Sequence, residues 1–538
     1  MQRIEFDVVV IGSGIAGLSA ALSSAEQGLR ILIVSRYEAS KPHSINGAGM
    51  NGIVSDSLDW KIHARDTIVA GDYLSNQLAV ETMCTDAYQT IERFITLGAP
   101  FRRNLVGSFG REIYHTPDIT GRTAIASLWK GLKARSDVHV MEGWRITDVV
   151  VENHAVAGIK MFNGSLQATV PCRAVVLATG GTSTLYSRAT TSASHYTADG
   201  IMAAFRCGAL LADLEMIQFH PTALPDGSVI SESARAAGAI LRNSIQEPFM
   251  HRYAPQKREL APRDVVSRAI FTEIESGRGS TSFVYLDFTK INSGYWDTDH
   301  IKEIRAMAME RCRIDIQVGP IPVAPAMHYL IGGVKTDING STNIPGLYAA
   351  GETASTGVHG ANRLGGNSLL EASVFGWRAG LHAAKFARTP SSHSTAPTNV
   401  ENCGTHTGSN RQIGDLLAQA QAIFGLAMGI KRSEVVLAEA VNTLSSLQQE
   451  VIRYQDEQWS DQYWDVANTV GLGLLSAHSA LLRQESRGAH YRIDYPARDD
   501  TRWSKHILLK RSHDDSLETS FEPVTYQGWF ELEQREMG

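Results

Sequence analysis

The sequence has few cysteines and no long hydrophobic run. Five cysteines are scattered over 538 residues, and none forms the C-x-x-C pair typical of zinc ribbons and many iron–sulfur sites. Few, scattered cysteines suit a reducing compartment. No apolar stretch reaches the ~18 residues of a membrane-spanning helix, and Glu5 and Asp7 lie where a secretion signal would be basic and then apolar. We therefore expect a cytoplasmic chain whose membrane association, if any, comes through partner subunits.

The sequence also lacks a strong excess of charge of one sign. The 50 Lys and Arg residues oppose 56 Asp and Glu, which gives a formal net charge of −6 without a basic block. Such a chain is poorly suited to binding nucleic acid, so we expect no nucleic-acid partner. The net charge does not exclude a local cationic pocket that binds a small anion. With 43% hydrophobic and 20% charged residues the composition is globular, and the length predicts about two to four domains.

Four apolar runs predict buried strands that share one sheet. Asp7–Ile11 and Leu29–Val34 flank a glycine turn and a small-residue helix at Leu18–Gln27, which together form a βαβ unit. Ala174–Ala178 and Leu347–Ala350 have the same apolar character. Because these strands are far apart in sequence, the simplest arrangement is a single sheet interrupted by long insertions.

The glycine turn predicts a site for a dinucleotide. Gly12-Ser13-Gly14-Ile15-Ala16-Gly17 has the spacing G-x-G-x-x-G between a strand and a helix, where backbone approaches a pyrophosphate at the helix N-terminus. We assign Gly12, Gly14 and Gly17 to cofactor binding, and a turn without a ligand is the alternative. The second strand ends in Ser35-Arg36 instead of an acidic residue. We expect Ser35 to contact the cofactor there. Arg36 leaves open the alternative that the dinucleotide carries a 2′-phosphate, which an arginine at this position can bind.

Two later segments favour FAD as the dinucleotide. Ala178-Thr179-Gly180-Gly181 follows a strand and lets the backbone pass close to the cofactor. Gly346-Leu347-Tyr348-Ala349-Ala350-Gly351-Glu352 brings backbone and Glu352 to the flavin side. We expect Gly180 and Glu352 among the cofactor contacts.

Four further segments carry a family resemblance. They are Gln218-Phe219-His220-Pro221-Thr222, Leu260-Ala261-Pro262-Arg263-Asp264, Ala326-Met327-His328-Tyr329 and His359-Gly360-Ala361-Asn362-Arg363, the last followed by Asn367-Ser368. With the glycine turn and in this order, they resemble the flavoprotein family of succinate dehydrogenase, fumarate reductase and L-aspartate oxidase. The resemblance extends from about Asp7 to Phe375 and returns over Arg487–Val524.

The resemblance and the patterns together predict an α/β protein. Its predicted parts are a discontinuous Rossmann-like FAD-binding domain (residues 1–227 and 345–390), an inserted α+β capping domain (228–344), a C-terminal helical domain (412–490) and a C-terminal tail region (491–538).

The resemblance implies a substrate site for a C4-type dicarboxylate. Two negative charges require fixed donors at both ends, and Arg offers a planar fork that matches a carboxylate. The implied substrate contacts are His220, Ser231, His328 and Arg363. The alternative for a histidine before a proline, such as His220, is a loop or core position.

By the same resemblance Arg263 is the catalytic acid/base. An arginine has such a high pKa that it requires a relay. Glu232-Ser233-Ala234-Arg235 resembles the family's Glu-x-x-Arg relay, so Glu232 and Arg235 join Arg263 as expected catalytic residues. The alternative for Arg263 is an ion pair with Asp264 at a helix start.

Several segments depart from the family's pattern. Pro42-His43-Ser44-Ile45-Asn46-Gly47-Ala48-Gly49 resembles the segment to which respiratory members attach FAD covalently, which implies cofactor contacts at His43 and Gly49, with a surface-loop histidine as the alternative. The family resemblance of Asn367-Ser368 implies a further cofactor contact at Ser368. Arg235-Ala236-Ala237-Gly238 lacks the acid of the family's Arg-Gly-Glu-Gly. In residues 104–115, where aspartate oxidases meet the substrate ammonium, Glu112 is the only acid.

We therefore predict an FAD-dependent oxidoreductase that interconverts a C4-type dicarboxylate and its alkene. Hydride would pass to or from flavin N5, with FAD held covalently through His43, an iron–sulfur subunit and membrane anchor as partners, and no metal on this chain. A soluble electron acceptor is an alternative. So are an L-aspartate oxidase that makes iminoaspartate for NAD biosynthesis and a non-catalytic flavin-binding assembly subunit.

Overall fold

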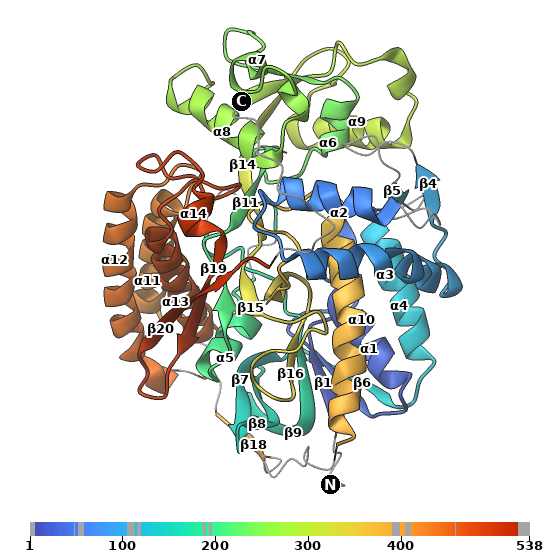
Figure 1. The fold of residues 1–538 in the computed structure, drawn as a ribbon, viewed down its shortest axis with the longest axis vertical. Coiled ribbons are helices and arrows are strands. Elements are labelled where there is room, and N and C mark those ends of the chain that lie inside the picture. The colour runs from blue at the N-terminus through green and yellow to red at the C-terminus, as the bar shows by residue number, and fades with distance from the viewer. Residues whose placement is uncertain are drawn as a thin grey trace.

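A computed structural model describes most of the chain. The described residues are 6–47, 49–51, 59–104, 113–115, 120–186, 190–192, 196–389, 399–403, 410–457 and 459–525. Figure 1 shows a central sheet region with long helices beside it, a green and yellow cap above it, and an orange group of helices at its left.

The central sheet has the strand order β6-β2-β1-β9-β8-β7, and two further strands, β16 and β18, pair with β9. Its strands are β1 (Phe6–Ile11), β2 (Ile31–Ser35), β6 (Val138–Glu142), β7 (Arg145–Glu152), β8 (Ala155–Phe162), β9 (Leu166–Leu177), β16 (Leu347–Ala349) and β18 (Asn399–Asn402). Val9 pairs with Val175 and Tyr348 with Val176, both in parallel register. These pairings confirm the prediction that the distant strands share one sheet. The prediction was possible because strands buried on both faces have continuous apolar sequences.

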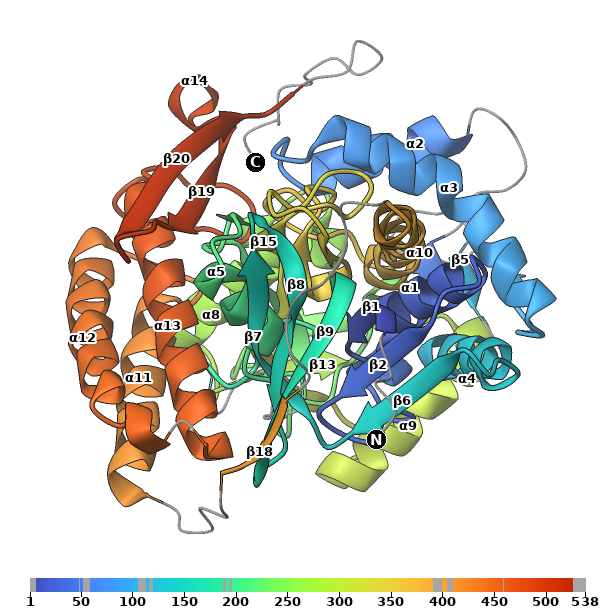
Figure 2. The ribbon, with the colours of Figure 1, turned by 90° about the horizontal axis from the view of Figure 1, so that it is seen from below.

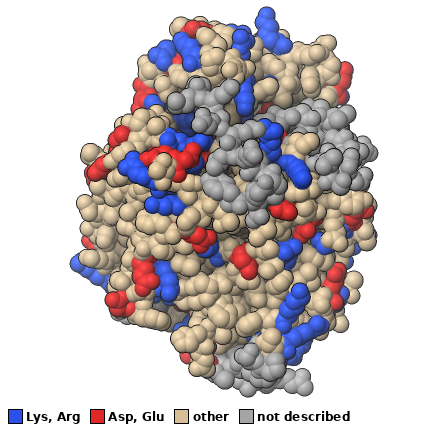
Figure 3. All heavy atoms as spheres, in the orientation of Figure 1, with Lys and Arg blue, Asp and Glu red and all other residues tan. Residues whose placement is uncertain are grey.

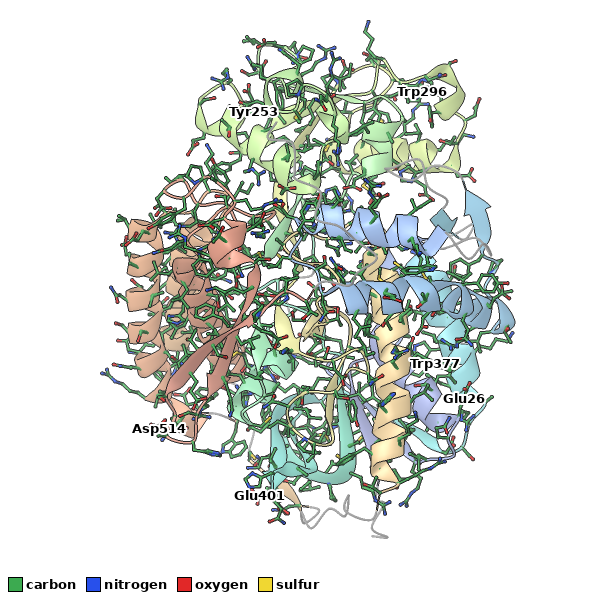
Figure 4. The ribbon with its side chains drawn as sticks, in the orientation of Figure 1. Glu26, Tyr253, Trp296, Trp377, Glu401 and Asp514 are labelled. Carbon is green, nitrogen blue, oxygen red and sulfur yellow. The ribbon has the colours of Figure 1, made fainter. Side chains whose placement is uncertain are left out.

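Helices cover this sheet and extend it on one side. Figure 2 shows α1 (Ile15–Ala25) and α10 (Asn367–Ala387) together over β1, with α4 (Thr120–Lys133) beside β6. The hydroxyl of Ser24 on α1 donates to the carbonyl of Gly380 on α10 at 2.8 Å. Helix α2 (Asp59–Ala70), helix α3 (Gln77–Thr96) and the small sheet of β3 (Met50–Asn51), β5 (Ile113–His115) and β4 (Arg102–Asn104) lie on the same side. Trp377 of α10, labelled in Figure 4, lies 4.2 Å under the Arg93 guanidinium of α3.

The cap contains a second, antiparallel sheet with the order β11-β14-β13-β12. Its elements are β11 (Ile217–Ala223), β12 (Ile240–Arg242), β13 (Val284–Asp287), β14 (Ile321–Leu330), α6 (Glu232–Ala236), α7 (Met250–Tyr253), α8 (Arg263–Glu275) and α9 (Asp299–Cys312). Buried Leu241, Phe249, Ile270 and Leu286 belong to a hydrophobic core of its own. Since β11 begins before residue 228, the sheet of the cap starts inside the segment expected for the FAD-binding domain; the domain limits themselves stay a prediction.

After β18 come three long helices, α11 (Arg411–Ala427), α12 (Glu434–Ile452) and α13 (Asp461–Leu482), in the segment that the sequence analysis assigned to a helical domain. Beyond them, α14 (Asp500–Trp503) leads into a hairpin of β19 (Lys505–Arg511) and β20 (Leu517–Pro523). The hairpin joins β10 (Leu211–Ala212), β15 (Gly333–Lys335) and β17 (Ala354–Ser355) in one five-stranded sheet. Residues 505–523 are therefore built into the fold and are not a trailing tail.

Two surface properties follow from the composition. On the face drawn in Figure 3, basic and acidic side chains are intermixed instead of forming a field of one sign. Within the described ranges, no helix is both long enough and apolar enough to cross a membrane.

Candidate active site

One cavity of about 1270 Å³ joins the glycine turn after β1 to the sheet of the cap. Its wall includes Gly12, Glu352, His220 and Arg363, which come from both halves of the chain. Ligand pockets usually enclose about 300–1,000 Å³. This cavity is therefore large enough for a dinucleotide and a small substrate side by side.

The glycine turn has the shape that a pyrophosphate requires. Gly12 has φ +113°, and a Cβ there would lie far inside van der Waals contact of the Ala178 carbonyl oxygen. Gly14 is the N-cap of α1, so the N-terminus of this helix opens into the cavity. Gly17 lies within the helix, where the absence of a side chain lets α1 approach the Gly12 carbonyl. The residues present thus fit a dinucleotide.

The end of β2 is occupied by an ionic network. The Ser35 hydroxyl lies 3.2 Å from that of Ser13. Arg36 binds Asp465 of α13 at 2.7 Å and lies 3.5 Å from Asp199, which also accepts from Arg145 at 2.6 Å. Carboxylates therefore match the Arg36 charge, and the 2′-phosphate alternative loses its support.

The remaining expected cofactor residues line the same cavity. His43, in a 3-10 turn over His43–Asn46, lies with Nε2 3.5 Å from the Ser192 hydroxyl. Glu352 accepts the Leu330 backbone N–H at 2.9 Å, and burial raises the pKa of this carboxyl to about 7. Gly49, Gly180 and Ser368 are also in the wall.

A buried histidine, His220, and a partly buried one, His328, lie next to each other on the cap side of the cavity. His220 of β11 and His328 of β14 have ring centroids 5.1 Å apart. Burial, followed by the Arg263 charge, lowers the pKa of both rings well below the ordinary value. The Thr222 backbone N–H donates to His220 Nδ1 at 3.3 Å, so the neutral ring carries its proton on Nε2. His220 is thereby prepared to donate a hydrogen bond.

A chain of charges connects Arg263, Glu232 and Arg235. Arg263 Nε donates to Glu232 Oε1 at 2.6 Å, and Arg235 Nη2 lies 3.6 Å from the same oxygen. Burial alone would raise the pKa of Glu232, but the charges of Arg263 and Arg235 hold it far below the ordinary value. Arg263 Nη1 also donates to Gln218 Oε1 at 3.0 Å. Asp264 binds Arg268 at 2.9 Å, while Arg263 turns toward the cavity.

Arg363 is a buried cation without a matching carboxylate in the described part of the chain. Its guanidinium carbon lies 4.5 Å from the Tyr329 ring centroid, and its Nε has no hydrogen-bond partner among the described residues. Burial lowers the pKa of Arg363 to about 10. A buried, unmatched guanidinium on a cavity wall is a site for an anion.

Ser233 and His300 of the wall, and Gln218 behind it, had no assigned role in the sequence analysis. Gln218 ties the substrate cluster together, since its Nε2 donates to the Arg363 carbonyl at 2.8 Å. Ser231, the N-cap of α6, lies 2.7 Å from the Ser233 hydroxyl, which in turn bonds His300. Gln218 stood in a motif and could have been found, whereas no sequence signal indicated His300. The side chains of residues 104–115 lie outside the described residues.

The fold and the cavity define a dinucleotide-binding protein, in which the cofactor cradle and the buried Arg363 share one chamber. Residues 7–369 match the family described as FAD binding domain, and residues 418–537 match that described as fumarate reductase flavoprotein C-term. The chain is 35% identical to a fumarate reductase flavoprotein subunit of Mycobacterium tuberculosis, over 98% of each chain. It is 34% identical to an L-aspartate oxidase of Streptomyces coelicolor, over 96% of this chain and 93% of the other.

The structure is similar to that of FrdA, from a variant of Escherichia coli quinol fumarate reductase, with a TM-score of 0.87, 28% identity and 98% of each chain covered. The chain belongs to the FAD-dependent flavoprotein family of succinate dehydrogenase, fumarate reductase and L-aspartate oxidase. It is an oxidoreductase of this family, and FAD is its cofactor.

Proposed function

We propose that this chain interconverts a C4-type dicarboxylate and its alkene. The observation that carries the proposal is the buried, unmatched Arg363, which shares the cavity with His220, His328 and the Arg263–Glu232 pair. Cations and hydrogen-bond donors dominate this cluster, as two carboxylates require.

In the proposed mechanism, Arg363, His328, His220 and Ser231 hold the two carboxylates. Bound FAD supplies the acceptor or donor of hydride. Arg263 exchanges the proton at the adjacent carbon, and it can do so despite its high pKa because Glu232 and Arg235 continue the path for the proton.

The residues proposed to hold FAD are the cradle and the flavin-side wall. The set consists of Gly12, Gly14, Gly17, Ser35, His43, Gly49, Gly180, Glu352 and Ser368. Among these, His43 is proposed to bind the flavin covalently. Acid-precipitated protein should then keep its flavin, and His43→Ser should release it into the supernatant; release from the unchanged protein would contradict the bond.

Electrons must leave the reduced flavin. The Mycobacterium tuberculosis relative is a flavoprotein subunit, and we infer that this chain also delivers electrons to a partner with an iron–sulfur centre, through which it reaches a membrane anchor. A soluble acceptor is the alternative. Copurification of an iron-containing partner from native extract distinguishes the two.

L-aspartate oxidation is the second candidate, and the 34% identical relative supports it. An ammonium group requires an acceptor, but the Glu232 carboxylate is engaged by Arg263 and Arg235. A non-catalytic assembly role predicts a missing acid/base, whereas Arg263 is present. Full turnover by Arg263→Ala would favour that role.

The first experiment is to mix oxidised protein anaerobically with succinate and, separately, with L-aspartate, and to follow the flavin absorbance. Bleaching by succinate alone is expected. Bleaching by aspartate alone would refute the proposal and establish an amino-acid oxidase. If neither bleaches the flavin, other dicarboxylates become the substrates to screen, because the segment Ala236-Ala237 departs from the family and Ala237 lines the cavity.

A further inference from the structure

Three polar side chains of the cap form a row of hydrogen bonds that ends at the substrate. Ser231 is the N-cap of α6, Ser233 is in the first turn of that helix, and His300 is in the first turn of α9, which Figure 1 shows beside α6 in the cap. All three line the cavity. Only Ser231 has a role in the proposed mechanism, so the other two require an explanation.

The contacts fix the order of the row. The Ser233 backbone N–H donates to Ser231 Oγ at 3.3 Å, and the two hydroxyl oxygens are 2.7 Å apart. The Ser233 hydroxyl is also hydrogen-bonded to His300 Nε2. Ser233 therefore stands between Ser231 and the imidazole.

The direction of the row depends on its histidine end, because each hydroxyl has one proton to donate. When His300 Nε2 carries a proton, it donates to Ser233, Ser233 donates to Ser231, and the Ser231 proton is left for a ligand that accepts. When Nε2 is bare, every bond reverses, and Ser231 accepts from a ligand that donates. A carboxylate is an acceptor, whereas an ammonium group is a donor.

We propose that His300, acting through Ser233, sets Ser231 as a hydrogen-bond donor and so selects a carboxylate over an ammonium at this end of the substrate. The inference rests on the proposed function, since it names what the same site distinguishes. His300 and Ser233 are positioning residues in this scheme.

The surrounding wall supports a donor at this place. Glu232, the next residue after Ser231, has its carboxylate engaged by Arg263, and Ala237 contributes only a methyl group to the wall. The first turns of α9 also present the carboxylates of Asp299 and Glu303 and the apolar side chains of Ile304 and Met307 to the cavity. None of these groups replaces the Ser231 hydroxyl as a partner for a carboxylate.

The test uses malonate, a dicarboxylate whose single methylene cannot become an alkene, titrated into the FAD-loaded protein while the flavin spectrum is followed. Ser233→Ala and His300→Leu should each raise the malonate Kd by about ten-fold, the lower range for a hydrogen bond to a charged group. The double variant should lose no more than either single variant, because both act in one row. With succinate, KM should rise while kcat stays within about two-fold.

Ser228→Ala is the matched control, because Ser228 lines the same wall but donates to Asp226 at 3.0 Å. It should leave the malonate Kd unchanged. Single variants that bind malonate as the wild type does, or a double variant whose loss is the product of the single losses, would overturn the inference. Wild-type protein that neither binds malonate nor is bleached by succinate would instead refute the proposed function.

Discussion

Replacing Arg363 by Met should weaken dicarboxylate binding and, at the same time, stabilise the empty protein. Burial lowers the pKa of this guanidinium from 12.5 to about 10. Since one pH unit corresponds to about 1.4 kcal/mol, the charged form costs on the order of 3 kcal/mol in the folded state, as an upper bound. A methionine of similar length keeps the apolar stem and removes this cost.

The same substitution leaves a buried substrate carboxylate without its partner. Removing one member of a buried pair costs about 3–5 kcal/mol, which corresponds to a loss of roughly 10²–10⁴-fold in affinity. The assay combines malonate titration, followed by the flavin spectrum, with thermal unfolding in the presence and absence of malonate. Malonate should raise the midpoint of the wild type but not that of Arg363→Met, and without malonate the variant should melt a few degrees higher.

Arg378→Met is the matched control. Arg378 lies in α10, the helix that begins four residues after Arg363, but unlike Arg363 it forms an ion pair, with Asp86 at 3.0 Å. This control should unfold at the same temperature as the wild type or slightly lower, and should bind malonate normally. The reasoning would be refuted if Arg363→Met bound malonate as tightly as the wild type, or if it melted below the wild type without ligand.

Three further predictions test the cradle, the relay and a buried acid. Gly12→Ala places a methyl group against the Ala178 carbonyl, so the purified protein should carry little flavin, and a normal visible absorbance per protein would contradict this. Glu232→Gln removes the partner of Arg263 and should slow anaerobic flavin reduction about 10²–10⁴-fold with flavin content unchanged, whereas a loss below about ten-fold would exclude the relay. Burial raises the pKa of Glu371 from 4.5 to about 8, so the native state keeps a proton that the unfolded state releases. Stability against urea should therefore fall as pH rises from about 4.5 to 8, and Glu371→Gln should flatten that fall; parallel profiles would refute it.

Much of the central sheet could be predicted because its strands are apolar throughout and are punctuated by glycine. The observed β1 and β9 end within one residue of the expected strands. Helix α1 begins at Ile15 instead of Leu18, because the N-cap is Gly14 and the third glycine of the motif already belongs to the helix. The hairpin near the C-terminus was missed because β20 is largely exposed and polar, which resembles a loop.

In the candidate site too, the residues that lie in local sequence patterns could be predicted and the others could not. Residues inside short motifs, such as His220 and Arg363, could be named from the sequence, and the structure brings them to one cavity. The Ser233–His300 contact joins residues 67 positions apart and has no local pattern. Asn51 had no assigned role, and its side chain donates to the Gly365 carbonyl at 2.8 Å, beside the loop that carries Arg363.

The pairing of β16 with β9 also has a consequence for biosynthesis. The cavity is lined by the first fifty residues, by residues from the middle of the chain and by residues 350–372. The cavity is therefore complete only after the ribosome has synthesised the first turns of α10. At ~5–20 residues per second this takes roughly 20–70 s. During that interval the edge of β9 that receives β16 lacks this partner, and an unpaired edge invites aggregation. We therefore expect FAD to bind only after residues 350–372 have been synthesised. A nascent chain that stalls before β16 should contain no flavin and should be a substrate for chaperones or proteases.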